Sequence, residues 1–177
     1  MKKRHLLAAT LVACSLGSQA QVIQSYQVRD AVTLRTPILT DSINTEGRKY
    51  ETKNLLSTAI GLNQDNYTTQ TMVADTAGFV TLAAADSEHL IYVVSTNIRA
   101  DRFMKGKLKV TSPVRWEAFI DGASKSKKEN ADDSLNVKAS QDIALRMEPE
   151  RDYVVTLKFL AHKDDKAAPA FKCEVVA

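Results

Sequence analysis

The side chains that could carry chemistry are few in this 177-residue sequence. Beyond position 20 the histidines are His89 and His162, and Cys173 is the cysteine that remains. Zinc needs three or four nitrogen or sulfur ligands, and a serine-histidine-aspartate triad needs three groups that converge in space. The sequence carries neither pattern, and it holds no G-x-S-x-G, P-loop, G-x-G-x-x-G or H-E-x-x-H motif. We therefore predict a chain that is not an enzyme and that needs no cofactor.

Acidic pairs are the next candidates for chemistry, and they lie in charged segments at residues 132–133 and 164–165. Calcium takes six or more oxygen ligands at close spacing, and the run at 129–134 could supply several of them. A solvated loop explains the same run, because residues 123–134 contain no apolar side chain larger than alanine. We expect that loop and no resident metal, with Asp132 and Asp133 as the candidates for a structural calcium.

Aromatic residues supply the one argument for a ligand. Trp116, the only tryptophan, alternates with the apolar residues 114, 118 and 120 on one face of a predicted strand, so it is expected in the core. Phe119 takes the opposite face. Sugar-binding sites instead stack an exposed aromatic ring on a pyranose and bind its hydroxyls with polar groups. The candidate ligand-binding residues under that alternative are Tyr67, Trp116, Phe119 and Asp121.

The N-terminus has the pattern of a secretory signal peptide. Basic residues at 2–4 precede an apolar run at 6–13 and small residues up to Ala20. Small residues at 18 and 20 predict cleavage before Gln21, which removes residues 1–20. Alternatively, Leu11-Val12-Ala13-Cys14 resembles a bacterial lipobox, in which Cys14 is lipidated and becomes the first residue. Both outcomes place the mature protein in the periplasm, in the cell envelope or outside the cell.

The charge balance argues against nucleic acid as a partner. The net charge of +3 comes from residues 2–4, because residues 21–177 hold 21 basic and 21 acidic side chains. A neutral mature chain provides no electrostatic attraction to nucleic acid or to an anionic membrane. No later segment reaches the ~20 continuous apolar residues of a membrane span. Apart from an N-terminal lipid, we expect no membrane attachment.

Strand signals dominate the remaining sequence. Turn residues recur every 8–12 residues and separate eight to ten short β-favouring runs, which predicts an all-β, two-sheet antiparallel sandwich of jelly-roll type with little helix. Residues 21–74 supply N-terminal strands and a loop, with at most one helical turn within 50–62, and residues 75–177 supply the core strands. The runs at 89–98 and 153–161 are apolar on both faces and should be central.

The stretch at 107–122 is predicted to be two strands joined by a tight turn and closed by a second turn at Asp121-Gly122. The link before it, residues 99–106, should be anchored in the core by Phe103 and Met104. Cys173 lies in a terminal strand and is expected to be a small buried side chain.

The order of these features resembles a known family. A central strand leads to Gly106-Lys107-Leu108-Lys109-Val110, then to Ser-Pro, to an aromatic strand ending in Asp121-Gly122, and to residues 148–153 (Glu-Pro-Glu-Arg-Asp-Tyr) before a strong strand. This order, over roughly residues 75–177, resembles jelly-roll modules of the galactose-binding-like type. Similar modules precede β-propeller and peptidase domains in exported bacterial enzymes of the prolyl-oligopeptidase type. Arg151-Asp152 stands where those modules have a glycine. The resemblance implies an accessory module whose catalytic residues would lie in other domains.

We therefore expect an exported, non-catalytic binding module of the bacterial cell envelope, which binds a glycan or an envelope protein or forms the front end of a larger hydrolase. The alternatives are a complete small lipoprotein that acts through protein–protein contact, and a hydrolase in its own right. An exposed aromatic patch would favour a sugar, and a long bare edge strand would favour a protein partner. A pocket that holds His89 or His162 beside a carboxylate would favour catalysis.

Overall fold

The computed structural model of the protein describes residues 12–14, 20–34, 47, 52–57, 71–84, 89–135 and 139–177, with the backbone alone at 12–14 and 52–54. Within these ranges it has twelve strands and one 3₁₀-helix, and none of its helices is long and apolar enough to cross a membrane. The strands beyond the predicted eight to ten are very short. In chain order the elements are β1 (Val12–Cys14), β2 (Gln21–Val22), β3 (Ser25–Thr33), η1 (Thr52–Ser57), β4 (Thr71–Val73), β5 (Val80–Thr81), β6 (His89–Ala100), β7 (Met104–Thr111), β8 (Arg115–Ile120), β9 (Ala123–Lys128), β10 (Ser140–Met147), β11 (Asp152–His162) and β12 (Ala170–Val176).

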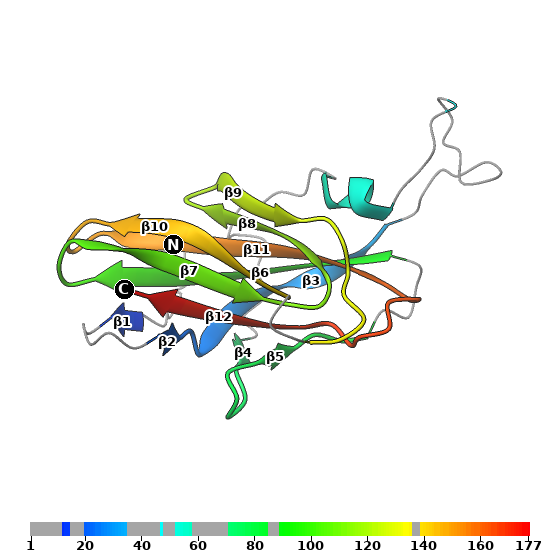
Figure 1. Cartoon of the computed structure of the whole chain (residues 1–177), viewed down its shortest axis with the longest axis horizontal. Helices are drawn as coiled ribbons and strands as arrows, with labels where there is room; N and C mark the ends of the chain where they lie inside the picture. The colour runs from blue at the N-terminus through cyan, green and yellow to red at the C-terminus, as the bar shows by residue number, and fades with distance from the viewer. Residues whose placement is uncertain are drawn as a thin grey trace, which may run out of the picture.

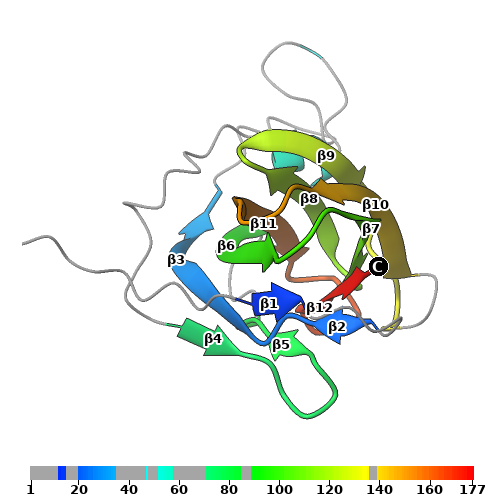
Figure 2. The same ribbon diagram turned by 90° about the vertical axis from the view of Figure 1, so that its left-hand side faces the viewer.

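The strands form two sheets that lie against each other (Figures 1 and 2). Sheet A has seven strands in the order β4-β3-β6-β11-β8-β9, with β1 also paired to β6. Sheet B has five strands in the order β10-β7-β12-β2, with β5 also paired to β12. The ladders are antiparallel except for the one between β1 and β6. The predicted all-β, two-sheet antiparallel sandwich with little helix is confirmed.

The chain changes sheet at most connections after β6. Strands β6, β8, β9 and β11 belong to sheet A, whereas β7, β10 and β12 belong to sheet B. The prediction of a tight turn between two paired strands within 107–122 is therefore wrong, since Ser112 to Val114 carry the chain from one sheet to the other. The second turn is a true hairpin between β8 and β9. Asp121 and Gly122 have φ values of 51° and 76°, and a two-residue type I′ turn requires positive φ at both positions.

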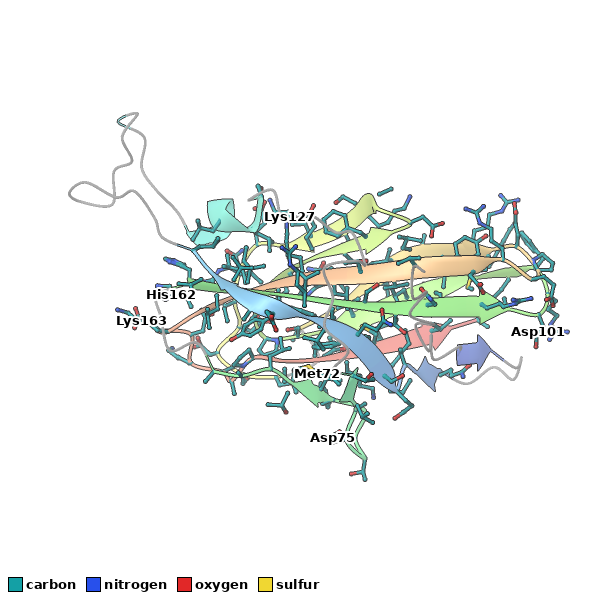
Figure 3. The ribbon with its side chains drawn as sticks, turned by 180° about the vertical axis from the view of Figure 1, so that it is seen from behind. Met72, Asp75, Asp101, Lys127, His162 and Lys163 are labelled. Atoms are coloured by element: carbon teal, nitrogen blue, oxygen red, sulfur yellow. The ribbon has the colours of Figure 1, made fainter. Side chains whose placement is uncertain are left out.

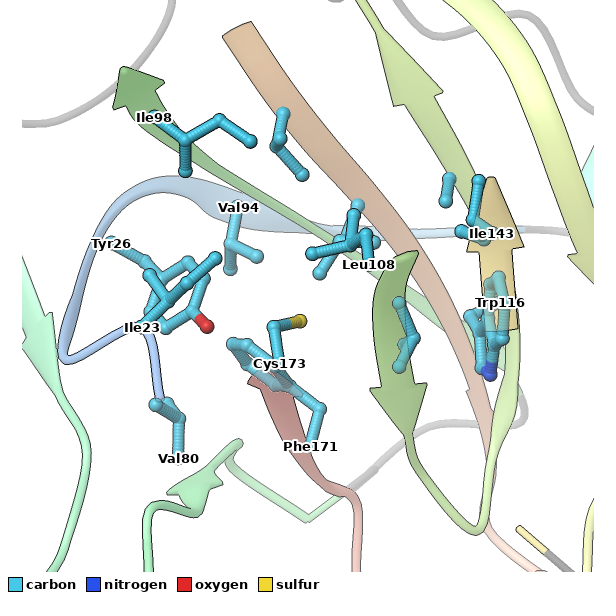
Figure 4. Packing of buried hydrophobic residues seen from close by; sticks show 14 of the residues in the cluster. Ile23, Tyr26, Val80, Val94, Ile98, Leu108, Trp116, Ile143, Phe171 and Cys173 are labelled. Carbon is cyan, nitrogen blue, oxygen red and sulfur yellow. The ribbon is translucent and has the colours of Figure 1, made fainter. Parts of the chain in front are cut away.

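The core lies between the sheets and contains most of the large side chains. Strands β6 and β11 are central in sheet A and are buried on both faces, as their continuous apolar sequences predict. Trp116 is fully buried, which confirms its predicted core position. Met104 and Cys173 are also buried, as predicted. Figure 4 shows the cluster around Cys173, which includes Ile23, Tyr26, Val80, Val94, Leu108 and Phe171.

The outer faces of the two sheets differ in what covers them. On sheet A, Leu56 of the 3₁₀-helix η1 packs with Leu160 of β11 and with two side chains of β6, Ile91 and Val93. The helix lies where the sequence predicted one helical turn. On sheet B, the outward side chains of β7 and β10 lie in solvent and are mostly charged. They include Lys105, Lys107, Asp142 and Arg146.

Two local predictions are wrong. Residues 123–134 do not form a continuous solvated loop, because residues 123–128 form strand β9, which pairs with β8. The type I′ turn brings this segment back beside β8, so the hairpin outweighs the low β-propensity of its lysines and serines. Phe103 is 45% exposed and is not a core anchor. It precedes β7 on the solvent side, where the Arg146 guanidinium lies 5.1 Å from its ring centroid.

Candidate functional site

A small cavity opens where β11 turns towards β12, at one end of the long axis of the sandwich. His162 and Lys163 mark this end in Figure 3, and Asp101 marks the opposite end. The cavity has a volume of about 250 Å³. Small apolar residues and four polar residues line it: Ala84, Val114, Ala161, Ala167, Ala168 and Pro169, with His162, Lys163, Asp165 and Lys166.

The turn after β11 is held by its own hydrogen bonds. The backbone N–H of His162 donates to Asp165 Oδ2 over 2.8 Å, and the backbone N–H of Asp165 donates to the carbonyl oxygen of His162 over 3.0 Å. An aspartate that accepts from a nearby backbone N–H stabilises a tight turn. The cavity wall formed by this turn is therefore fixed in advance of any ligand.

Arg115 of β8 fixes the carboxylate of Asp165 from the neighbouring strand. Its Nη1 donates to Oδ1 over 2.9 Å and to Oδ2 over 3.1 Å. Both side chains are largely buried, with 16% of Arg115 and 9% of Asp165 exposed. The Asp165 carboxylate therefore accepts hydrogen bonds both from Arg115 and from the backbone of the turn, which fixes its position in the cavity wall.

His162 is the one imidazole on the cavity wall. Its Nδ1 accepts a hydrogen bond of 3.2 Å from the backbone N–H of Asp164. Its cross-strand partner is His89, with the two ring centroids 4.5 Å apart. The cavity thus joins a histidine to a carboxylate, the arrangement that would favour catalysis. However, the residues that line it include no serine, threonine, cysteine or tyrosine that could act as a nucleophile.

The structure does not bring the predicted ligand-binding residues together. Trp116 is fully buried, so its ring offers no face to a sugar. Phe119 lies on the opposite face of β8, with Lys158 Nζ 5.5 Å from its ring centroid. Asp121 sits in the β8–β9 turn, where it accepts from the backbone N–H of Val154 over 2.9 Å. Tyr67 lies outside the described residues, as does the side chain of Cys14.

The acidic candidates for calcium are engaged by lysines. Asp132 Oδ2 lies 2.8 Å from Lys128 Nζ, and Asp133 Oδ2 lies 2.7 Å from Lys166 Nζ. Within the described ranges, no group of three or more histidine, cysteine, aspartate or glutamate side chains is placed to hold a metal ion.

Lys128 binds the crossover, residues 112–114, that connects β7 of sheet B to β8 of sheet A. Its ammonium, 7% exposed, donates to the carbonyl oxygens of Ser112, Pro113 and Val114 over 2.7, 3.1 and 3.4 Å. A buried ammonium needs partners of this kind, because an unpaired buried charge is costly. By binding these three carbonyls and Asp132, Lys128 therefore anchors the part of the cavity wall to which Val114 belongs.

Sequence reasoning missed both anchors of the cavity. Arg115 and Asp165 are 50 residues apart, and no local pattern links them. Lys128 lies in a polar run that resembles a solvated surface, so its burial follows only from the pairing of β9 with β8.

Comparisons with known proteins give no family. No family model matches the sequence, and no curated protein matches it. Among solved structures, a beta-glucosidase from Kluyveromyces marxianus in complex with glucose aligns over 54% of this chain and 12% of its own length, with 6% identity and a TM-score of 0.42. A selenomethionine-labelled beta-glucosidase from the same organism aligns over 50% and 11%, with 8% identity and a TM-score of 0.42.

An anti-sigma factor domain-containing protein aligns over 92% of this chain and 48% of its own length, with 10% identity and a TM-score of 0.39. This chain therefore spans less than half the length of each of these three proteins. At such TM-scores the likenesses support no inference about activity.

Proposed function

We propose that the protein is an exported, non-catalytic β-sandwich that serves as an accessory binding module of the bacterial cell envelope. The observation that carries the proposal is the cavity at the β11–β12 turn. The Asp165 carboxylate on its wall is bound by Arg115 and by the backbone of the turn, and its lining residues include no serine, threonine, cysteine or tyrosine. These features support a cavity that binds a ligand rather than one that transforms it.

The size and lining of the cavity indicate the ligand class. Its volume of about 250 Å³ is below the ~300–1,000 Å³ of cavities that enclose drug-sized molecules, so it admits a single unit of a larger ligand. His162, Lys163 and Lys166 in the lining carry hydrogen-bond donors, and the other lining residues apart from Asp165 are small and apolar. One sugar residue of an envelope glycan matches this size and polarity.

The position of the module in a larger enzyme is a second part of the proposal. The Asp121-Gly122 turn lies between β8 and β9, and residues 148–151 precede the central strand β11. These positions support the resemblance of the sandwich to galactose-binding-like modules. As the front end of a hydrolase, the module would hold a glycan or protein close to a catalytic domain.

A glycan array and an envelope-peptide pull-down test the binding function. We expect the full chain, expressed with its export signal, to bind a restricted set of glycans, and we expect His162→Ala and Lys166→Ala to weaken binding. Lys125→Ala on the exposed part of β9 is the matched control and should bind normally. Absence of binding to every glycan on the array, together with capture of one envelope protein in the pull-down, would contradict the assignment of a sugar ligand. Turnover of a substrate that is lost in His162→Ala would contradict the non-catalytic assignment.

Mass spectrometry of the mature N-terminus tests export and chooses between its two routes. Cleavage before Gln21 removes β1, whereas lipidation leaves a diacylated Cys14 as the first residue. An N-terminus that begins at Met1 in the exported fraction would contradict both routes.

A further inference from the structure

Among the described residues, the main strand paths of the two sheets end in four edge strands, and three of these are blunted. The edges of sheet A are β4, with three residues, and β9, with six. The edges of sheet B are β2, with two residues, and β10, with eight. Because unpaired backbone groups on an edge strand can pair with another chain, proteins shorten or charge such edges. Strand β10 is the long edge in the part of the chain that the structure describes.

Strand β9 is protected by its sequence and β10 is not. Strand β9 carries three lysines within six residues, and its ladder with β8 contains a register shift next to Phe119. Lysines and bulges both discourage further strand pairing. Strand β10 has no lysine and no proline, and its ladder with β7 runs without a shift from Ser140 to Met147. Figure 2 shows it at the outer end of sheet B.

The sequence of β10 is complementary to itself. We propose that two copies of the protein pair antiparallel through β10, centred on Ala144, and join their B sheets into one. In this register Asp142 of each copy lies opposite Arg146 of the other, and Ile143 lies opposite Leu145. Directly opposed charges of opposite sign stabilise an antiparallel pair. A two-fold axis repeats each contact, as expected for an isologous dimer.

The charges around Arg146 support a second copy of the protein as the partner of strand β10. Its cross-strand neighbour is Lys105, which has the same charge. The guanidinium lies over the ring of Phe103, and no carboxylate of the described residues lies within 4 Å of it. Asp142 and Arg146 are exposed on the same face as Ala144, whose methyl group leaves room at the centre. A second copy would bring its Asp142, which within one copy pairs with Lys107, beside this guanidinium.

Strand β9 limits the length of the proposed pairing. Near the start of β10, Ser126 Oγ donates to Gln141 Oε1 over 3.4 Å, but no backbone ladder joins the two strands. The pairing is therefore confined to residues 142–146. This surface is independent of the cavity at the β11–β12 turn, so the proposed dimer and the proposed binding function can fail separately.

Cross-linking tests the register. In an antiparallel pair, directly opposite Cα atoms are about 4.5–5.5 Å apart, which suits a disulfide. We expect the Ala144→Cys chain to form a disulfide-linked dimer under mild oxidation on non-reducing gels. Ala123→Cys, exposed on β9, is the matched control and should stay monomeric, and the buried Cys173 should not react. Cross-linking of Ala144→Cys no greater than that of the control overturns the proposal, as does a mixed disulfide with another protein only.

Charge reversal tests the pairing without new covalent bonds. We expect Asp142→Arg and Arg146→Asp each to weaken dimerisation by on the order of 10- to 100-fold in sedimentation experiments, because each places like charges opposite one another twice. The double variant should recover the dimer, since both pairs are again complementary. An unchanged association state in both single variants overturns the proposal, and so does failure of the correctly folded double variant to recover the dimer.

Discussion

Two ion pairs on the outer faces of the sheets have nearly the same length and very different surroundings. On sheet A, Lys158 Nζ lies 3.1 Å from Glu117 Oε2, with 6% and 16% of the two side chains exposed. On sheet B, Lys107 Nζ lies 3.0 Å from Asp142 Oδ2, with 60% and 48% exposed. Water screens the second pair, whereas the first pair has lost most of its hydration. The distance between the charges therefore does not set their contribution to stability.

The largest loss of stability is expected in the interior between the two sheets, and it gives a reference for the losses expected at the two ion pairs. Trp116→Ala should lower the free energy of unfolding by ~3–5 kcal/mol, because it leaves a cavity where a fully buried indole packs. Urea denaturation of the wild-type and variant proteins measures the loss. A variant that keeps its stability but loses ligand binding would show that Trp116 belongs to a site and not to the core.

The two ion pairs should respond unequally to loss of the carboxylate. Glu117→Gln should cost about 2–4 kcal/mol, because it removes the negative charge beside a buried ammonium. Asp142→Asn, the matched change on the open face, should cost less than about 0.5 kcal/mol. Both are measured by denaturant unfolding at low protein concentration, where association is negligible. Equal losses would mean that the outer face of sheet A is as well hydrated as that of sheet B.

The interior should make the protein less stable at alkaline pH. Burial raises the pKa of the Cys173 thiol from its ordinary 9.0 to about 12, and burial also raises the pKa of Tyr26. The folded state thus favours the protonated groups, while the unfolded chain releases their protons at lower pH. The stabilisation that comes from keeping these groups protonated should therefore be fully present below about pH 9 and should be lost as the pH rises towards 12. At pH 10 the loss from Cys173 should be on the order of 1 kcal/mol.

Chemical denaturation across this pH range provides the measurement. Cys173→Ala should flatten the part of the profile that begins near pH 9, although it also costs some packing at all pH values. An unchanged slope would place the alkaline sensitivity elsewhere.

The smallest effect is expected at the turn before β7 on the open side. Phe103→Ser should change stability by less than about 0.5 kcal/mol, because the ring is 45% exposed and lies beside the Arg146 guanidinium at the surface. Thermal unfolding of the variant checks this. A loss of 2 kcal/mol or more would restore Phe103 to the role of a buried anchor.

The sequence predicts best where a strand is buried on both faces or alternates cleanly. Strands β6 and β11 have continuous apolar sequences, and Trp116 alternates with small apolar residues, so their positions follow from local patterns. The crossover at Ser112 and the strand at 123–128 cannot be predicted from local patterns. A tight turn and a connection between sheets have the same composition, and residues 123–128 are as polar as a loop. The cavity depends on contacts between distant residues, such as Arg115 with Asp165, which no single-sequence pattern encodes.

The contact between Lys128 and the crossover at residues 112–114 has a consequence for the order of folding. Lys128 reaches the carbonyls of residues 112–114 across only 14 to 16 residues of chain. Contacts between β6 and β11 close loops of about 60 residues, as between Ser95 and Val155. Shorter loops lose less entropy on closure, so the hairpin of β8 and β9 with its crossover is expected to form early. The central strands of sheet A would then assemble on the β8–β9 hairpin, whose crossover is held in place by the Lys128 ammonium.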